Sequence, residues 1–248
     1  MFADLKGKTV VITGGVTGIG GAASLAFAKA GARVLAQYFG GGPELAEFAT
    51  RGIATVKLDL TKKGAPDQLI GEAKAKLGRI DVLINNAGGM VERRNLDSFD
   101  DALFDQVMDL NVRQLFACCR AVVPVFRAQG AGNIINVTSI AARSGGNAGA
   151  SVYAGSKGFV SAFSKSMAKE LAGEQIRVNC VSPGTIHTAF HDRYSDEAKR
   201  EAARKSIPMG KLGLAADCAG TFLYLASDAA SGYVTGQVVE VNGGQLMP

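Results

Sequence analysis

The chain has 248 residues, of which 47% are hydrophobic, and a formal net charge of +5 at pH 7. This length fits one large domain or two small ones, and the apolar fraction is ample for a core of that size. The positive charges are spread along the chain, which does not indicate nucleic-acid binding, and no apolar run is long enough to span a bilayer. With two histidines and four cysteines that lack metal-ligand spacing, we expect no metal site.

The N-terminus lacks the apolar region of a signal peptide. The four cysteines are interpreted as buried apolar residues of a protein in a reducing compartment. We therefore expect a cytoplasmic protein that contacts neither a membrane nor a nucleic acid.

The first predicted elements are a strand, a glycine-rich turn and a helix. The β-branched run 9–13 predicts the strand, Gly14-Gly-Val-Thr-Gly-Ile-Gly20 forms the turn, and the alanine-rich stretch 22–30 predicts the helix. Glycines let the backbone of such a turn approach phosphate groups closely, and a helix N-terminus favours their negative charge. We expect this turn to bind the pyrophosphate of a dinucleotide.

Strand and helix signals then alternate to the end of the chain, without a Pro- or Ser-rich linker. Two long helices are expected over 99–123 and 151–172. The pattern predicts an α/β fold, a single Rossmann-type domain over residues 1–248 whose doubly wound parallel sheet of seven strands carries helices on both faces. The remaining strands are expected near residues 33–37, 54–58, 81–85, 132–138, 176–181 and 237–241.

Tyr153 and Lys157 lie four residues apart in the second long helix. Residues i and i+4 share one face of a helix, so the ammonium can lie beside the phenol. A nearby ammonium lowers the pKa of a tyrosine, whose ordinary value is about 10, and prepares the hydroxyl for proton transfer. In isolation such a pair is more often a surface tyrosine beside a solvated lysine; the cofactor turn ahead of it favours the catalytic interpretation.

These motifs, in this order, resemble those of the short-chain dehydrogenase/reductase family over nearly the whole chain. The resemblance implies an NAD(P)-dependent oxidoreductase that acts on CH–OH groups. The matching segments are Thr13-Gly-x-x-x-Gly-Ile-Gly20, Asp59, Asn85-Asn-Ala-Gly88, Asn111, Ser139, Tyr153 with Lys157, Arg177-Val-Asn-Cys-Val-Ser-Pro-Gly184 and Thr235-Gly-Gln-Val-Val-Glu-Val-Asn-Gly-Gly244.

The resemblance also implies the catalytic roles. Tyr153 would be the general acid in carbonyl reduction, Ser139 would hydrogen-bond the substrate oxygen, and Lys157 would lower the tyrosine pKa and bind the nicotinamide ribose. Asn111 would hold a water that links Lys157 to solvent. Taken singly, Ser139 is equally well a strand-end cap and Asn111 a helix-kink residue.

Cofactor contacts implied by the resemblance gather where the strands end, because ligands of open α/β sheets lie outside the carboxyl ends of the strands. They are Gly14, Thr17, Gly18, Ile19, Gly20, Tyr38, Phe39, Asp59, Leu60, Asn86, Ala87, Gly88, Tyr153, Lys157, Pro183, Gly184, Ile186 and Thr188.

The choice between NAD and NADP depends on the end of the second strand. An acidic residue there would bind the ribose 2′-hydroxyl of NAD, but the expected position holds Tyr38. NADP needs a cation for its 2′-phosphate, and the positions where relatives carry one hold the uncharged Thr17 and Phe39. NAD is favoured, and NADP remains the alternative.

Substrate contacts are expected from the least regular segments, which include a polar lid near 185–208. Two segments, Gly149-Ala-Ser-x-Tyr153 and Pro183-Gly-Thr-Ile-His-Thr-Ala-Phe-His191, resemble those of bacterial reductases of keto-sugar acids such as deoxy-keto-uronates. Arg143, Asn147 and His187 are the predicted substrate contacts, and Arg93 and Arg94 lie on a loop expected to border the same pocket.

Other functions remain open. The main alternative is a 3-oxoacyl-acyl-carrier-protein reductase or a hydroxyacid dehydrogenase, and the first would need a basic surface such as Arg127 with Lys165 and Lys169. The family resemblance also implies a homotetramer built on the two long helices, which carry Phe116, Phe159 and Phe163, although these rings are equally compatible with core packing.

Overall fold

A computed structural model describes residues 2–40, 45–188 and 197–248. Its core is a parallel sheet of seven strands in the order β3-β2-β1-β4-β5-β6-β9. The predicted fold class is therefore confirmed, and each predicted strand is present. Their bounds are β1 (Thr9–Thr13), β2 (Arg33–Tyr38), β3 (Ala54–Lys57), β4 (Val82–Asn85), β5 (Gly132–Val137), β6 (Ile176–Pro183) and β9 (Val238–Val241).

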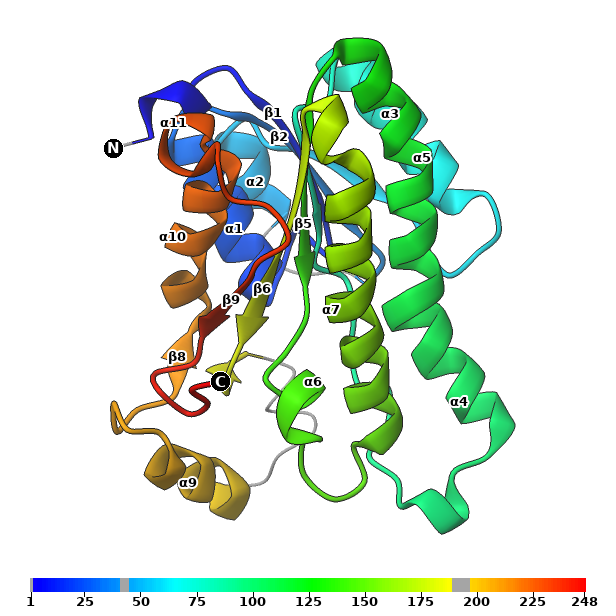
Figure 1. Ribbon diagram of the computed structural model, residues 1–248, viewed down its shortest axis with the longest axis vertical. Coiled ribbons are helices and arrows are strands. Elements are labelled where there is room, and N and C mark those ends of the chain that lie inside the picture. Colours follow the sequence, from blue (N-terminus) through cyan, green and yellow to red (C-terminus); the bar gives the residue numbers. More distant parts are fainter. Residues whose placement is uncertain (1, 41–44, 189–196) are drawn as a thin grey trace.

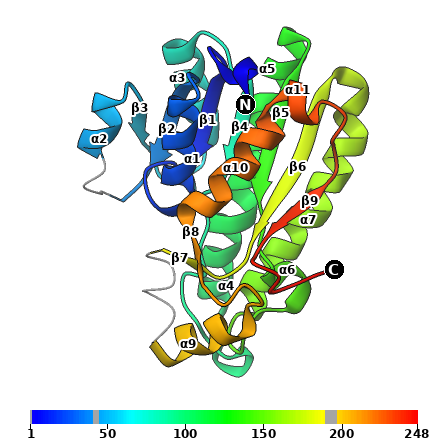
Figure 2. The same ribbon diagram turned by 90° about the vertical axis from the view of Figure 1, so that its left-hand side faces the viewer.

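Helices cover both faces of the sheet (Figures 1 and 2). One face packs against α3 (Ala65–Leu77), α5 (Gln114–Gln129) and α7 (Ser151–Leu171). The other packs against α1 (Gly18–Lys29) and α10 (Ala215–Ala226). Because both faces are covered, the central strands are continuous runs of buried residues rather than alternating ones.

The order of the strands reverses between β1 and β4. A crevice opens at such a switch point, outside the carboxyl ends of the strands, and this is where ligands of open α/β sheets bind. The glycine-rich turn follows β1 and the Asn85-Asn-Ala-Gly88 segment follows β4, so both border this crevice.

The first long helix differs from its predicted bounds of 99–123. It consists of α4 (Asp101–Met108), a π-helical turn over Asp109–Arg113 and then α5, which continues to Gln129 through Pro124. Its start is fixed by Asp100, whose side chain accepts a hydrogen bond from the Leu103 amide at 2.8 Å. The predicted helix 151–172 is confirmed as α7.

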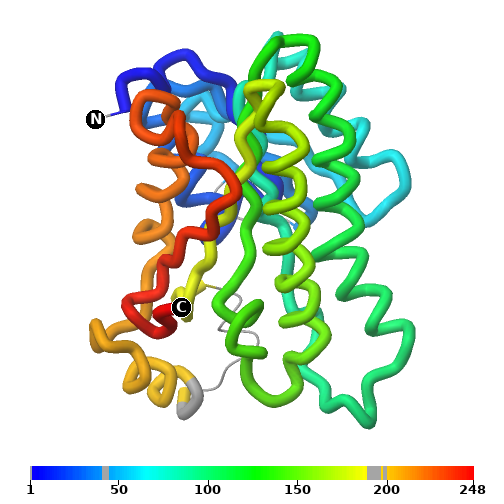
Figure 3. Tube along the Cα trace, viewed as in Figure 1, coloured from blue at the N-terminus to red at the C-terminus, as the bar shows by residue number. Residues whose placement is uncertain are grey.

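A smaller layer lies below the carboxyl ends of the strands. It contains the short parallel pair β7 (Ile186–His187) and β8 (Gly213–Leu214), which the sequence analysis did not predict, and α9 (Glu197–Ser206). In Figure 3 the last part of the chain returns from this layer to run beside β6. Of the predicted lid, residues 189–196 lie outside the described residues.

The remaining helices are short: α2 (Leu45–Thr50), α6 (Ala141–Ser144), α11 (Asp228–Ser231) and 3-10 turns at Ala3–Leu5, Leu96–Ser98 and Ala172–Glu174. None of the helices described is both long and apolar enough to cross a membrane.

Candidate active site

The glycine-rich turn is held tightly against the segment that follows β4. Gly14 has a φ of 57°, and its amide donates to Oε1 of Gln37 at 2.9 Å. The side-chain amide of Asn86 donates to the carbonyl oxygens of Thr13 and Gly14 at 3.1 and 3.0 Å. A Cβ at Gly20 would lie 2.2 Å from the Gly14 carbonyl oxygen, so only glycine fits there.

Gln37 is a residue that the sequence analysis missed. It is buried at 3% exposure, and its side chain joins the glycine turn to the Leu58 carbonyl oxygen at 2.7 Å. The sequence did not predict this role, because a glutamine within a strand carries no local pattern that shows which segments its side chain will contact. Gln37 fixes the turn relative to the segment that follows β3, where Asp59 lies.

A cavity of about 910 Å³ runs from the glycine turn to the end of β5. It is large enough for a dinucleotide and a small substrate together. Most of the predicted cofactor contacts line it: Gly14, Thr17, Gly18, Ile19, Phe39, Asp59, Leu60, Asn86, Ala87, Gly88, Tyr153, Lys157, Pro183, Gly184, Ile186 and Thr188. Tyr38 is not on its wall, and Gly20 lies beneath the turn.

The residues present fit a nicotinamide dinucleotide. The start of α1 carries no acidic residue in its first turn, and the glycines there leave no Cβ between the backbone and the cavity. At the far end, Asp59 accepts hydrogen bonds from the amide and hydroxyl of Thr61 at 3.1 and 2.6 Å, and Phe39 is 61% exposed.

The predicted catalytic side chains converge at the carboxyl end of β5. Ser139 forms a hydrogen bond with Tyr153, and both line the cavity. Lys157, one turn further along α7, is 4% exposed and donates from Nζ to the Val137 carbonyl oxygen at 2.9 Å. Thr138 anchors the same turn of α7, since its hydroxyl donates to the Lys157 carbonyl oxygen at 2.8 Å.

The sequence analysis predicted that Lys157 lowers the pKa of Tyr153, but in the structure this pKa is raised. Burial raises the pKa of Tyr153 to about 12, and the hydrogen bond with Ser139 only partly opposes this. Burial also lowers the pKa of Lys157 to about 8. The reason is that Nζ lies 5.8 Å from the centre of the tyrosine ring and is bonded to a carbonyl, so burial outweighs the attraction between the two groups.

Asn111 lies in the π-helical turn and is fully buried. Its side chain accepts from the Gly89 amide at 3.0 Å and donates to the carbonyl oxygens of Gly89 and Val107 at 2.7 and 2.9 Å. π-turns of this kind are frequent at functional sites. Here the turn fixes the loop after β4, next to Lys157: a Cβ at Gly88 would lie 3.1 Å from Nζ.

The predicted substrate contacts are only partly brought together. Asn147 lines the cavity, whereas Arg143 and His187 are not on its wall. Nε of Arg143 lies 3.4 Å from Glu240, and His187 is exposed in β7. Arg93 lines the cavity, and Arg94 pairs with Glu92 and Asp100 instead.

Further residues on the wall were not named individually from the sequence, although several lie in the irregular segments from which substrate contacts were expected. Most lie on α4, on its π-turn or in loops, where no local pattern marks a lining residue. They are Thr61, Lys62, Gly89, Met90, Val91, Gln106, Asp109, Leu110, Gln114, Val137, Thr138, Ile140, Ala141, Gly146, Ala150 and Thr185. Among the described residues, no group of three or more His, Cys, Asp or Glu side chains could hold a metal ion.

Comparisons with known proteins agree with this geometry. A family model described as "Enoyl-(Acyl carrier protein) reductase" matches residues 14–245. The chain is 38% identical to the 3-oxoacyl-[acyl-carrier-protein] reductase FabG of Thermotoga maritima, over 98% of this chain and 99% of that protein. It is 37% identical to Dehydrogenase/reductase SDR family member 6 of Aquarana catesbeiana, over 97% of this chain and 98% of that protein.

Solved structures are similar as well. The NADH-dependent reductase A1-R' responsible for alginate metabolism superposes with a TM-score of 0.90 at 38% identity, over 99% of this chain and all of that one. The same reductase complexed with NAD gives a TM-score of 0.87 over the whole of both chains.

Proposed function

This chain belongs to the short-chain dehydrogenase/reductase family, and on that premise we propose that it reduces a small, hydrophilic keto-sugar or keto-sugar acid to the alcohol. Like its relatives it is an NAD(P)-dependent oxidoreductase that acts on CH–OH groups. One observation carries the choice of substrate: beside apolar residues such as Met90 and Ile140, the cavity wall carries the polar side chains of Asn147, Gln106 and Arg93. Among the described residues, its aromatic rings are those of Tyr153 and Phe39 alone.

Three side chains would carry out the proton chemistry, and a fourth would hold the backbone beside them in place. At neutral pH, a Tyr153 hydroxyl with a pKa of about 12 is protonated, as an acid for carbonyl reduction must be. Ser139 would hydrogen-bond the same substrate oxygen. Lys157 would bind the ribose, and its charge would stabilise the phenolate that forms when Tyr153 gives up its proton. Asn111 would fix the loop beside Lys157. When bound, the nicotinamide supplies the hydride.

NAD is proposed as the preferred cofactor. Thr17 and Phe39 both line the cavity and are uncharged, so neither can pair with a 2′-phosphate. The similar reductase of alginate metabolism is NADH-dependent and was solved with NAD, which agrees with this choice. We also propose that the chain forms one domain with a substrate lid near 185–208.

The alternative is a 3-oxoacyl-acyl-carrier-protein reductase, and the names of the curated relatives support it equally. A carrier protein is acidic and would need free cations near the cavity. Arg127 does not meet this need, because it forms two short contacts with Glu174, at 2.6 and 2.9 Å. Lys165 and Lys169 remain exposed on α7.

One turnover experiment separates the two functions. Purified enzyme is supplied with NADH or NADPH and with either a deoxy-keto-uronate or a 3-ketoacyl thioester. We expect a higher kcat/KM for the keto-uronate. Efficient reduction of the thioester with no turnover of any keto-sugar would overturn the proposed substrate and leave the family assignment intact.

A further inference from the structure

Three arginines were expected to border the substrate pocket, and their surroundings differ. Arg94 is paired with Glu92 and Asp100, and Arg143 lies against Glu240. Arg93 lies on the cavity wall and forms no ion pair with any residue that the structure describes. We propose that Arg93 binds the carboxylate of an acidic substrate, an inference that rests on the proposed reduction of keto-sugar acids.

Arg93 is held in place by the loop that leads into α7. Its Nη1 donates to the Ala148 carbonyl oxygen at 2.8 Å, and the backbone amide of Arg94 donates to the Gly149 carbonyl oxygen at 3.1 Å. Gly149 has a φ of 77°, and a Cβ there would lie 2.8 Å from Cγ of Arg93. Glycine at position 149 therefore makes room for the arginine, and the two loops fix its direction before a ligand arrives.

The hydrogen-bond state of Arg93 also points to a ligand. Its Nε is buried and has no acceptor among the described residues. A buried donor without a partner is unfavourable, so such a group calls for an explanation. Nη2 also has no acceptor among the described residues but is not buried, so a carboxylate in the cavity can reach this end of the planar guanidinium fork.

The other charged groups on the cavity wall are less suited than Arg93 to bind a substrate carboxylate. Lys157 lies beneath the catalytic tyrosine, and Asp59 and Lys62 lie near each other after β3, at 4.0 Å. Asp109 is paired with Arg113. Arg93 is thus the cation on this wall that forms no ion pair with a described residue and lies against the loop that leads to the helix of Tyr153.

Binding of an unreactive acid tests this without relying on turnover. The full chain, saturated with NAD, is titrated calorimetrically with glucuronate and with its uncharged methyl ester. The wild type should prefer the acid, and Arg93→Gln should weaken binding of glucuronate by about 10- to 100-fold while leaving the ester unchanged. Arg93→Lys should retain part of the preference. Arg94→Gln, which removes an equal charge one residue away, should retain all of it, and thermal melts check that each variant is folded.

The possible results are distinct. If Arg93→Gln binds glucuronate as the wild type does, or if the wild type does not distinguish the acid from the ester, the role of Arg93 is refuted, whether or not keto-uronates are turned over. If binding depends on Arg93 but no keto-sugar acid is reduced, Arg93 remains an anion-binding residue and the proposed substrate is wrong.

Discussion

Lys157 shows how burial and function oppose each other at a single residue. Its ammonium is almost inaccessible, and its hydrogen bond goes to a neutral carbonyl rather than to a carboxylate. Withdrawing an ammonium from water favours its uncharged form, which is why its pKa falls to about 8. Such an arrangement is unfavourable for folding and is retained where a function needs the charge.

Replacing Lys157 by Met should therefore stabilise the cofactor-free protein at pH 7 and abolish activity. Between about pH 8 and 10.5 the unfolded chain holds the lysine proton and the folded one does not, so the wild type gains stability relative to the variant as pH rises. Urea unfolding of both proteins from pH 7 to 10.5 measures the difference. A difference that stays constant over this range would contradict the lowered pKa; Lys165→Met, exposed on the same helix, is the matched control.

Replacing Tyr153 by Phe removes the proton donor and keeps the ring. We expect unchanged folding and cofactor binding, and a loss of about 10²-fold or more in kcat, the scale of general acid catalysis. Steady-state kinetics and fluorescence titration with NADH measure the two properties. Turnover at the wild-type rate would disprove the catalytic role of Tyr153.

Replacing Phe39 by Arg should move the cofactor preference toward NADPH, because a guanidinium can form charge-assisted hydrogen bonds with the 2′-phosphate. The ratio of kcat/KM for NADH and NADPH is the measurement, and the unmodified enzyme should favour NADH. Phe39→Leu controls for loss of the exposed ring. Stronger use of NADPH by the unmodified enzyme would mean that uncharged groups of the loop bind the phosphate.

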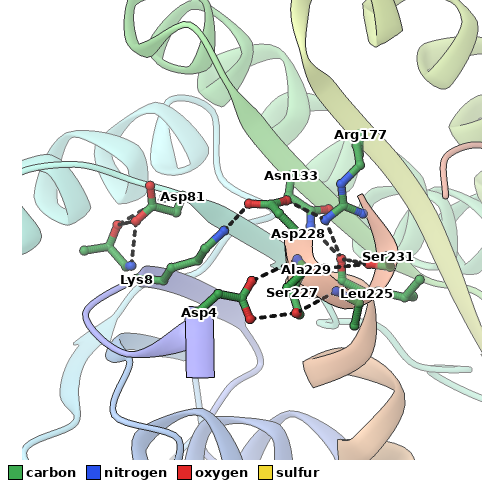
Figure 4. A network of polar contacts seen from close by, with 12 residues as sticks. Asp4, Lys8, Asp81, Asn133, Arg177, Leu225, Ser227, Asp228, Ala229 and Ser231 are labelled. Atoms are coloured by element: carbon green, nitrogen blue, oxygen red, sulfur yellow. Dashed lines mark hydrogen bonds and ion pairs between the residues drawn. The ribbon is translucent and has the colours of Figure 1, made fainter. Parts of the chain in front are cut away.

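At the scale of elements, a network of hydrogen bonds and ion pairs connects the N-terminal residues Asp4 and Lys8 to the junction between α10 and α11 (Figure 4). Asp228 accepts hydrogen bonds from Lys8 and from Nη2 of Arg177, the latter at 3.0 Å. Asp4 accepts from the Ser227 hydroxyl and the Ala229 amide at 2.7 and 3.2 Å. The network joins the segment before β1 to β6 and α11 at the end of the sheet opposite the active site.

Asp228→Asn should lower the free energy of unfolding by about 1 kcal/mol, a small value because the carboxylate is well exposed. Burial alone would raise the pKa of Asp228, but hydrogen bonds from Lys8 and Arg177 hold it below the ordinary value. The stabilisation is therefore full above the ordinary pKa of an aspartate and is lost as pH falls through the lowered one. Urea unfolding at pH 7 and pH 3 tests this against Asp97→Asn, an exposed control; equal effects of the two substitutions would contradict it.

At the scale of the whole molecule, an aromatic cluster lies partly exposed on α5 and α7. The ring of Phe163 stacks on Phe159 at 5.3 Å between centroids and lies 6.0 Å from Phe116. Phe116 and Phe159 are 42% and 39% exposed, more than residues of a monomer's core would be. This favours the interpretation of these rings as subunit contacts, and we propose a homotetramer.

The tetramer predicts a mass of four chains in light scattering at micromolar concentration. Phe159→Asp places a charge in the cluster and should give smaller species with the fold retained by circular dichroism. Leu96→Asp, at another exposed apolar position, should leave the mass unchanged. A monomeric wild type would refute the proposal.

The sequence by itself determined the order of the elements and the nature of the chemistry. The glycines after β1 and the Tyr153/Lys157 pair are requirements of local backbone: close approach to a phosphate and a shared helix face. Such requirements involve neighbours within a few residues, so they are visible in the chain. The first long helix was predicted to end at residue 123, whereas α5, packed on the sheet, continues through Pro124 to Gln129.

Only the tertiary structure decided which side chains share a site. Gln37 ties the glycine turn to the residue that follows β3, Asn111 ties a π-turn to Gly89, and Arg93 rather than Arg143 lies on the cavity wall. Each of these contacts joins segments far apart in the sequence. The directions of the pKa shifts at Tyr153 and Lys157 were also decided only by the tertiary structure. Burial of a group depends on all the elements packed around it, and the spacing of two residues along a helix does not show how deeply they are buried.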